Sequence, residues 1–210
     1  MKIVAISDSH HKHYYLKLPK GDMLIHAGDL TYRGERIEQM LVIDWFKHIA
    51  KKYKYVVSVM GNHDMNMTKA WFDSLHYLPN NVHILQDSGI EIEGINFYGS
   101  PYSVRFGDWG FGEPDDKLAV RFNHIPKKTN ILITHGPAYS ILDRNKYGEC
   151  CGSKSLYQKI KQLPNLKHHL FGHLHEQGGK QEIIENVTFS NVSVLDENYE
   201  IKNKATIIEV

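Results

Sequence analysis

Cysteine is scarce in this chain, and its two cysteines, Cys150 and Cys151, are adjacent. A disulfide between neighbouring residues would be strained, and the sequence has no other cysteine from which to build a disulfide framework. The chain also lacks an excess of charge, since 25 basic and 24 acidic residues leave a formal net charge of +1. This composition fits a reducing compartment and gives no support to long-range attraction toward nucleic acid or an anionic membrane.

Long hydrophobic runs, internal repeats and low-complexity tracts are missing as well. Met1-Lys2 leads into a run of only a few apolar residues before Ser7-Asp8, which is too short for a signal-peptide core or a membrane span. We therefore expect a cytoplasmic protein with no membrane element. The 210 residues, 41% of them hydrophobic, suit one large α/β domain, so we expect a single domain over residues 1–210.

Short apolar runs in this sequence repeatedly end in polar residues. The run over residues 56–60 stops at Gly61 and then presents Asn62, His63 and Asp64. The same arrangement occurs at four other places: Asp8-Ser9-His10, Gly28-Asp29, His135 and Gly172-His173-Leu174-His175. Because α/β sheets place ligand groups in the loops at the carboxyl ends of their strands, we interpret these five strand ends as parts of one site.

The remaining pattern predicts alternating strands and helices. Strands are expected over residues 3–6, 23–27, 55–60, 130–134 and 167–171, with closing strands in 181–195 and 205–210. Helices are expected over residues 35–53, 69–76, 115–123 and 153–162. The first of these carries apolar positions at helical spacing, namely Ile37, Met40, Leu41, Trp45, His48 and Ile49. Alternation over residues 90–99 predicts a hairpin that begins a second, antiparallel region, and the long loop 100–114 is expected to be functional.

The polar residues at the strand ends are oxygen and nitrogen donors without a thiolate: Asp8, His10, Asp29, Asn62, His135, His173 and His175. Such a set suits Mn, Fe, Zn or similar divalent ions, and seven donors are too many for one ion. Two ions roughly 3.5–4 Å apart, sharing a carboxylate and a water-derived hydroxide, are the usual device for displacement at phosphorus. The donor set therefore predicts a phosphoester hydrolase.

In their order along the chain, these motifs resemble the calcineurin-like metallophosphoesterase superfamily. The wider contexts Leu24-Ile25-His26-Ala27-Gly28-Asp29, Thr134-His135-Gly136-Pro137 and Phe171-Gly172-His173-Leu174-His175 are similar to its metallophosphoesterase-domain-containing (MPPED-type) branch. The resemblance implies an α/β fold, a four-layer α-β-β-α sandwich with mixed sheets. It also implies two divalent metal ions and phosphodiester hydrolysis by a metal-bridging hydroxide.

The resemblance also implies a role for each residue. One metal would be held by Asp8, His10 and His175, and the other by Asn62, His135 and His173, with Asp29 bridging both. His63 would be the general acid or a transition-state cation, oriented by Asp64 through its other ring nitrogen. Gly28-Asp29 continues as Leu30-Thr31-Tyr32-Arg33 instead of the Asp and Arg usual in serine/threonine phosphatases, which weakens a protein-phosphatase interpretation.

The substrate is expected to be a small soluble phosphoester. The loop after Gly99 offers aromatic faces and a cation that suit a nucleobase and a second phosphate oxygen. Its candidate substrate-binding residues are Tyr102, Arg105, Trp109 and Phe111, with Phe106 beside them. These favour a nucleotide-like phosphodiester or a cyclic nucleotide, although an aromatic loop also packs readily onto its own domain.

Three other functions stay open as alternatives. The first is a small-molecule phosphomonoesterase, and the second is a non-catalytic binding or scaffold module on the same fold, as in a retromer subunit. The third, a nuclease, lacks a basic stretch interleaved with aromatic residues to hold a strand. Nine further histidines are given no role and are expected to pack or to be solvated: His11, His13, His26, His48, His76, His83, His124, His168 and His169. The sequence leaves the native metals and the oligomeric state open.

Overall fold

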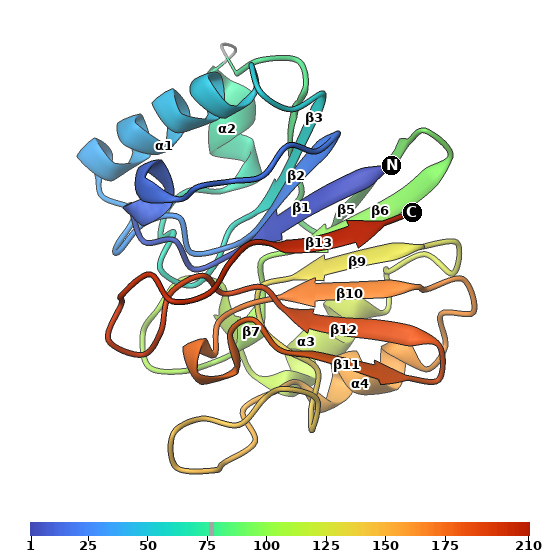
Figure 1. Cartoon of the computed structure of the whole chain (residues 1–210). Helices are drawn as coiled ribbons and strands as arrows, with labels where there is room; N and C mark the ends of the chain where they lie inside the picture. The colour runs from blue at the N-terminus through green and yellow to red at the C-terminus, as the bar shows by residue number, and fades with distance from the viewer. Residues whose placement is uncertain (76–77) are drawn as a thin grey trace.

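A computed structural model describes residues 1–75 and 78–210, and its first sheet has the strand order β13-β1-β2-β3-β4 (Figure 1). The strands are β1 (Lys2–Ile6), β2 (Met23–Ala27), β3 (Tyr55–Val59), β4 (Val82–Ile84) and β13 (Thr206–Glu209). β1 to β4 are parallel, whereas β13 runs antiparallel to β1. Parallel strands point their carboxyl ends toward one edge, so the loops after β1, β2 and β3 meet there.

The second sheet has the order β11-β12-β10-β9-β6-β5. Its strands are β5 (Ser88–Ile92), β6 (Ile95–Ser100), β9 (Ile131–Thr134), β10 (His168–Phe171), β11 (Gln181–Ile184) and β12 (Val187–Asn191). The expected hairpin is present as β5 and β6, but the wholly antiparallel region expected beyond it is wrong. β6, β9, β10 and β12 are parallel because helices return the chain between β6 and β9 and between β9 and β10.

Within the long loop expected to be functional, a short parallel pair forms from β7 (Ser103–Val104) and β8 (Gly112–Glu113). The two crossover helices that follow are α3 (Asp115–Phe122) and α4 (Lys154–Ile160). The Ser153 side chain caps α4 by accepting a hydrogen bond from the Leu156 backbone N–H at 3.0 Å. Both helices lie within the ranges predicted from the sequence.

Helix α1 (Arg36–Ile49) begins with a capping box between Glu35 and Glu38 and ends four residues before the predicted position. Its buried face is formed by Val42, Ile43, Trp45, Phe46 and Ile49. The predicted face is therefore wrong in its first two turns, where Ile37, Met40 and Leu41 are exposed, and at His48, which is exposed as well. Trp45 and Phe46 bury more apolar area than those three side chains, and they set the rotation of the helix.

Helix α2 (Lys69–Leu75) covers the same sheet as α1. Its predicted last residue, His76, lies outside the described residues. Two short 3₁₀ helices complete the description, η1 (Lys12–Tyr15) and η2 (His175–Gln177). Within the described chain, none of the helices is both long and apolar enough to cross a membrane.

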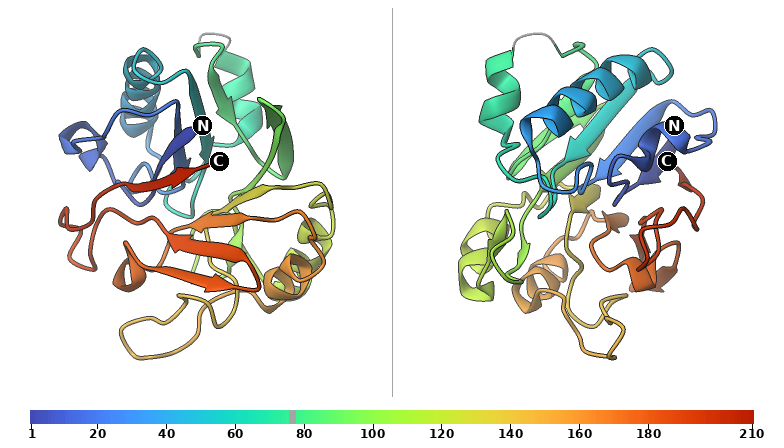
Figure 2. Two further views of the ribbon diagram at one scale, coloured as in Figure 1. Left: turned by 45° about the vertical axis from the view of Figure 1, so that its right-hand side comes forward. Right: turned by 90° about the vertical axis from the view of Figure 1, so that its left-hand side faces the viewer.

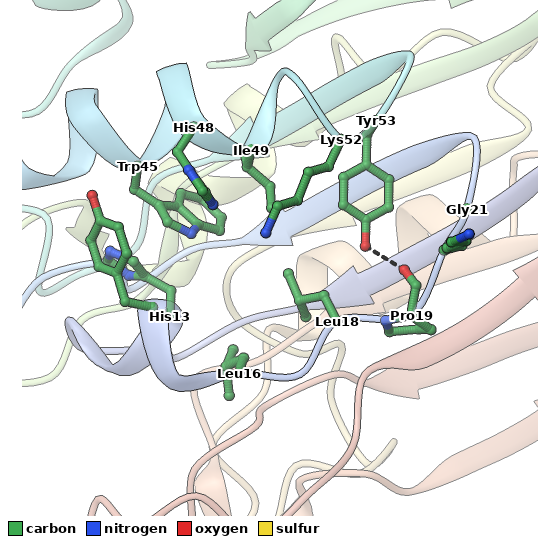
Figure 3. A pocket seen from close by; sticks show the side chains of 12 residues that line it. His13, Leu16, Leu18, Pro19, Gly21, Trp45, His48, Ile49, Lys52 and Tyr53 are labelled. Atoms are coloured by element: carbon green, nitrogen blue, oxygen red, sulfur yellow. Dashed lines mark hydrogen bonds between the residues drawn. The ribbon is translucent and has the colours of Figure 1, made fainter.

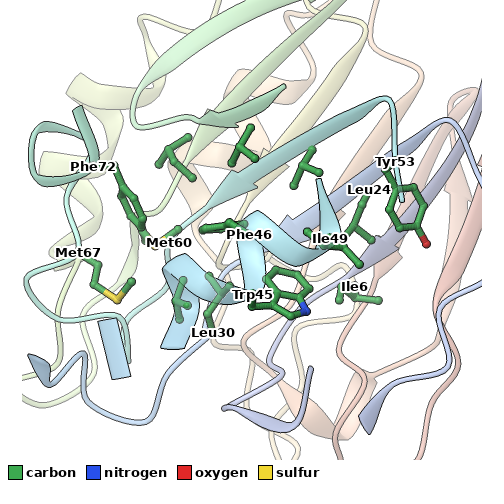
Figure 4. Close-up of a cluster of buried hydrophobic side chains, with 14 of the residues drawn as sticks. Ile6, Leu24, Leu30, Trp45, Phe46, Ile49, Tyr53, Met60, Met67 and Phe72 are labelled. Carbon is green, nitrogen blue, oxygen red and sulfur yellow. The ribbon is translucent and has the colours of Figure 1, made fainter. Parts of the chain in front are cut away.

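Three hydrophobic clusters separate four layers. The first lies between α1, α2 and the first sheet (Figure 4). The second lies between the two sheets, and the third lies between the second sheet and helices α3 and α4. β1 shows the alternation, since Val4 and Ile6 face the first cluster while Ile3 and Ala5 face the second. Figures 1 and 2 show the resulting α-β-β-α sandwich, which confirms the expected fold.

Candidate metal centre

The seven predicted metal donors converge at one rim of the sandwich. They follow the carboxyl ends of five strands, two in the second sheet and three in the first. The strands are β1, β2, β3, β9 and β10, and the donors are Asp8, His10, Asp29, Asn62, His135, His173 and His175. Side chains that are up to 167 positions apart in sequence therefore share one small volume.

Two groups of these donors have the spacing of a metal site. The ligand atoms of Asp8, His10 and His175 lie within 4.8 Å of one another, and so do those of Asp8, Asp29 and His135. Asp8 belongs to both groups, and both of its carboxylate oxygens accept hydrogen bonds from the His173 backbone N–H, at 3.0 and 3.1 Å. The rim thus holds two overlapping sets of ligands.

Asp29 lies between the two sets. Its Oδ2 is 3.8 Å from His10 Nε2 on one side and 3.3 Å from His135 Nε2 on the other. Its Oδ1 accepts a hydrogen bond from the His63 backbone N–H at 2.8 Å, which fixes the carboxylate plane. This position suits a carboxylate that contacts two ions.

Asn62 completes the second set. Its Oδ1 lies 2.8 Å from His135 Nε2 and 2.8 Å from His173 Nδ1, and these two ring nitrogens are 3.2 Å apart. The amide oxygen and two imidazole nitrogens therefore point at a common centre. His173 presents Nδ1 to this centre, unlike the other histidines of the rim.

Three of those histidines have their second ring nitrogen fixed by a backbone carbonyl. In each case Nδ1–H donates to the carbonyl oxygen at 2.8–3.0 Å, which leaves the Nε2 lone pair free for a ligand bond. The pairs are His10 with Thr31, His135 with Ala27, and His175 with Asp196. The backbone thus selects the tautomer that binds a metal.

The charges of the rim also suit a divalent ion. Burial acts to raise the pKa of Asp8, but the hydrogen bond and charge of His175 outweigh it, so the pKa is lowered. Burial acts to lower the pKa of His135, but Asp29 outweighs it and raises the pKa to about 9. Burial acts in the same direction at His175, but Asp8 outweighs it and raises the pKa to about 9 as well, so these two imidazoles balance the two carboxylates when no metal is bound. Across the described residues, buried His10 Nε2 has no hydrogen-bond partner, as expected of a ligand atom whose partner is a metal.

Two glycines make the close approach of the strand ends possible. A Cβ at Gly172 would lie 2.0 Å from Asp8 Oδ2, and a Cβ at Gly61 would lie 2.2 Å from Asp29 Oδ1. Asp8, Asp29 and His173 themselves have left-handed backbone, with φ of 51°, 58° and 70°. Such strain in residues other than glycine is concentrated at functional sites, and here it turns the donors toward the rim.

Residues 1–177 match the family model described as calcineurin-like phosphoesterase. The chain belongs to this family. It is also 31% identical to human metallophosphoesterase domain-containing protein 1, over the whole chain and 71% of that protein. A UPF0046 protein of Caenorhabditis elegans is likewise 31% identical, over the whole chain and 75% of its own length.

A third relative of this phosphoesterase has an unrelated name. The probable rhamnogalacturonate lyase C of Emericella nidulans is 34% identical over 87% of the chain, but the match covers only 18% of that protein. The lyase activity in its name is therefore not carried over to this chain. The family and the converging donors together establish a metal-dependent phosphoesterase with candidate ligands for its metals.

His63, the expected acid of this phosphoesterase, lies at the rim beside His10, with ring centroids 4.7 Å apart. The expected role of Asp64 is wrong. The buried Asp64 carboxylate accepts hydrogen bonds from the backbone N–H groups of Leu30, Thr31 and Gly61, so it fixes the loop. His63 Nδ1–H instead donates to the Tyr32 carbonyl oxygen at 2.8 Å. The sequence does not distinguish an Asp that fixes a loop from an Asp that orients the neighbouring imidazole, because either would directly follow the histidine.

A pocket of about 570 Å³ opens over the donors of this phosphoesterase. Of the predicted substrate-binding residues, Arg105 and Trp109 line it, and so does Phe106. The predictions for Tyr102 and Phe111 are wrong, because the two rings pack on each other, 5.5 Å apart, and against the hydrophobic clusters. Arg105, Phe106 and Trp109 lie between β7 and β8, whereas Tyr102 and Phe111 each come directly before one of these strands, so only part of the aromatic set reaches the pocket.

Sequence reasoning missed Tyr199 in this phosphoesterase. Its ring lies 4.9 Å from that of His10 and 5.2 Å from that of His175, and it lines the pocket. It lies beyond residue 177, where the family match ends, in a turn that returns to the rim after β12. Tyr199 belongs to the tight turn from Asp196 to Glu200, and this turn contains no ligand-like motif from which a site residue could be predicted.

Proposed function

We propose that this phosphoesterase hydrolyses a small, nucleotide-like phosphodiester, such as a cyclic nucleotide, at a dinuclear metal centre. Two bound divalent ions would supply a nucleophile derived from water and neutralise charge on the phosphoryl oxygens. One would be held by Asp8, His10 and His175, the other by Asn62, His135 and His173, with Asp29 between them. The complete donor set favours an enzyme over a scaffold module, which has no need of these ligands.

The observation that carries the diester proposal is the aromatic wall beside His63. The Trp109 ring stacks on the His63 imidazole, with centroids 4.1 Å apart and planes at 28°. The guanidinium of Arg33 lies 6.0 Å from the Trp109 ring centroid, and Arg105 lines the same pocket. An aromatic face next to a phosphate site suits a nucleobase, and the cations suit the remaining phosphate oxygen.

His63 would act at the leaving oxygen. Its Nδ1–H is held by Tyr32, so Nε2 is the nitrogen available to hold or donate a proton. The pocket has room for two ester substituents, which a monoester does not need. A small-molecule phosphomonoesterase is the runner-up, because the same donors bind a monoester equally well.

The test compares catalytic efficiency on bis-nitrophenyl phosphate, nitrophenyl phosphate and cyclic nucleotides, in the wild type, Trp109→Ala and the control Tyr102→Phe. Tyr102 belongs to the same loop but lies outside the pocket. Trp109→Ala should lower efficiency on cyclic nucleotides by about tenfold or more, since stacking contributes roughly 1–3 kcal/mol per base. Hydrolysis confined to monoesters contradicts the diester proposal. An equal loss on all three substrates would show that Trp109 acts by positioning His63, and it would contradict the proposal of a nucleobase pocket.

A further inference from the structure

A second pocket, of about 480 Å³, lies between α1 and the segment 13–21 that leads from η1 to β2 (Figure 3). Over the described parts of the chain, its lining and that of the metal-site pocket have no residue in common. A volume of several hundred cubic ångströms suits a small organic ligand. The pocket is therefore large enough to be a site of its own.

The body of this second pocket is apolar. Leu16 and Leu18 come from the loop side, and Trp45, Ile49 and Tyr53 come from the α1 side. The Tyr53 hydroxyl donates to the Pro19 carbonyl oxygen at 2.6 Å, which ties the loop to the end of the helix (Figure 3). Such walls favour an aliphatic or aromatic ligand body.

The polar groups of the second pocket are cations and donors. Lys20, His48 and Lys52 line it, and none of its described lining residues is acidic. Considering the described chain alone, neither lysine has an ion-pair partner. Figure 3 shows the Lys52 amino group and the indole nitrogen of Trp45 turned into the space between the helix and the loop. None of the described lining residues balances this positive charge.

The indole N–H of Trp45 adds a second, independent observation. Trp45 is 1% exposed, and among the described residues its N–H has no acceptor. On the same wall, His13 is 2% exposed and its Nε2 also lacks a partner within the described structure. Buried polar atoms in proteins are almost always paired, so the unpartnered His13 Nε2 indicates a missing polar group, and the Trp45 N–H is a further donor on the same wall.

We infer that this pocket binds a small organic anion with an apolar body, such as a medium-chain or aromatic carboxylate. The apolar part packs against Leu16, Leu18 and Ile49. The anionic group pairs with Lys52 and accepts the Trp45 N–H. Charge-assisted hydrogen bonds of this kind are stronger than neutral ones.

One lining residue of the anion pocket contacts the segment that carries two candidate metal ligands. His13 Nδ1 lies 3.1 Å from the Ser9 hydroxyl, and Ser9 stands between the donors Asp8 and His10. A bound anion bridges α1 and the loop, and it immobilises a segment that also carries two candidate ligands. The anion pocket is thus placed to influence the phosphoesterase without touching its substrate.

The test uses octanoate as the probe, with 1-octanol as the uncharged match, and the full chain loaded with zinc. Titration is followed by ¹H–¹⁵N NMR, since the chain has three tryptophans and their indole signals are easily resolved. Trp45→Phe assigns the Trp45 signal. Octanoate should shift that signal and leave the Trp109 signal of the metal-site pocket in place. It should also bind about tenfold more tightly than octanol.

Variants of neighbouring lysines separate the anion pocket from general surface charge. Lys52→Gln should weaken octanoate binding about tenfold, since a hydrogen bond to a charged group contributes roughly 1.5–3 kcal/mol. Lys51→Gln, an exposed neighbour outside the lining, should leave it unchanged. Equal affinity for octanoate and octanol, or equal losses in the two variants, would overturn the inference. So would displacement of octanoate by inorganic phosphate, because that would assign the binding to the metal centre.

Discussion

Two histidines of the metal rim, His135 and His175, differ from the core histidines in the sign of their pKa shift. His135 has its pKa raised to about 9 because Asp29 outweighs the effect of burial. His26 and His169 have theirs lowered to about 3, mainly by burial. A hydroxyl contacts each core ring, Ser9 at 2.9 Å from His26 Nε2 and Thr134 at 2.7 Å from His169 Nε2. A carboxylate oxygen at 3.3–3.5 Å therefore raises the pKa of His135 and His175, whereas burial lowers the pKa of the core histidines and of the rim histidines His10 and His173.

Removal of the Asp29 carboxylate, which raises the pKa of His135, should have the largest effect on metal content and activity. Asp29→Ala is expected to lower metal content and activity together, by several orders of magnitude in rate, because Asp29 contacts donors of both sets. His175→Ala, which alters one set, should retain the other metal. Elemental analysis and turnover are the measurements, with Asp22→Ala at the opposite end of β2 as the control. Two equivalents of metal and near-normal turnover in Asp29→Ala would show the bridging assignment to be wrong.

His63 allows a further comparison, because it shares a backbone hydrogen bond at Nδ1 with three of the rim histidines. Its Nδ1 is held by a backbone carbonyl, but within the described residues its ring is absent from both ligand groups. His63→Ala should therefore retain the metals and lose roughly 10²–10⁴-fold in rate. The loss should be greater for an alkoxide leaving group than for a nitrophenolate, which needs little protonation. Equal losses on both would leave His63 as a positioning residue.

Substitution of a core histidine should change the stability of the protein and leave its activity unchanged. The pKa of His169 is lowered from 6.5 to about 3 by burial, so below pH 6.5 the unfolded chain takes up a proton that the folded chain does not. This contribution to stability is complete above pH 6.5 and falls by about 1.4 kcal/mol per pH unit as the pH drops toward 3.

Urea unfolding of metal-free protein at pH 7 and pH 5 measures this effect. Between pH 7 and pH 5, the free energy of unfolding should fall by about 2 kcal/mol less in His169→Leu than in the wild type. His124→Leu, an exposed site, is the control. Identical pH dependence in His169→Leu and the wild type would show that His169 does not oppose acid unfolding.

The sequence predicted most of this site because strand ends are local signals. An apolar run followed by Gly61-Asn62 or Gly172-His173 is visible in any window, and the parallel sheet brings such ends together. The orienting of His63 by the Tyr32 carbonyl was not predictable, because a backbone contact leaves no residue-specific trace. Tyr199 was missed because it lies in a turn with no ligand motif. The buried face of α1 was predicted wrongly because Val42 and Phe46, which also have helical spacing relative to Ile49, are buried in place of Ile37 and Met40.

The hydrogen bonds from His173 to Asp8 join positions that are 165 residues apart. On the ribosome the first carboxylates therefore emerge long before the histidines that must complete their metal set. Domains form as their last contacts become available, so the centre closes only when β10 has left the exit tunnel and paired beside β9. Any metal held by this complete donor set would therefore bind only after the two sheets have formed and joined.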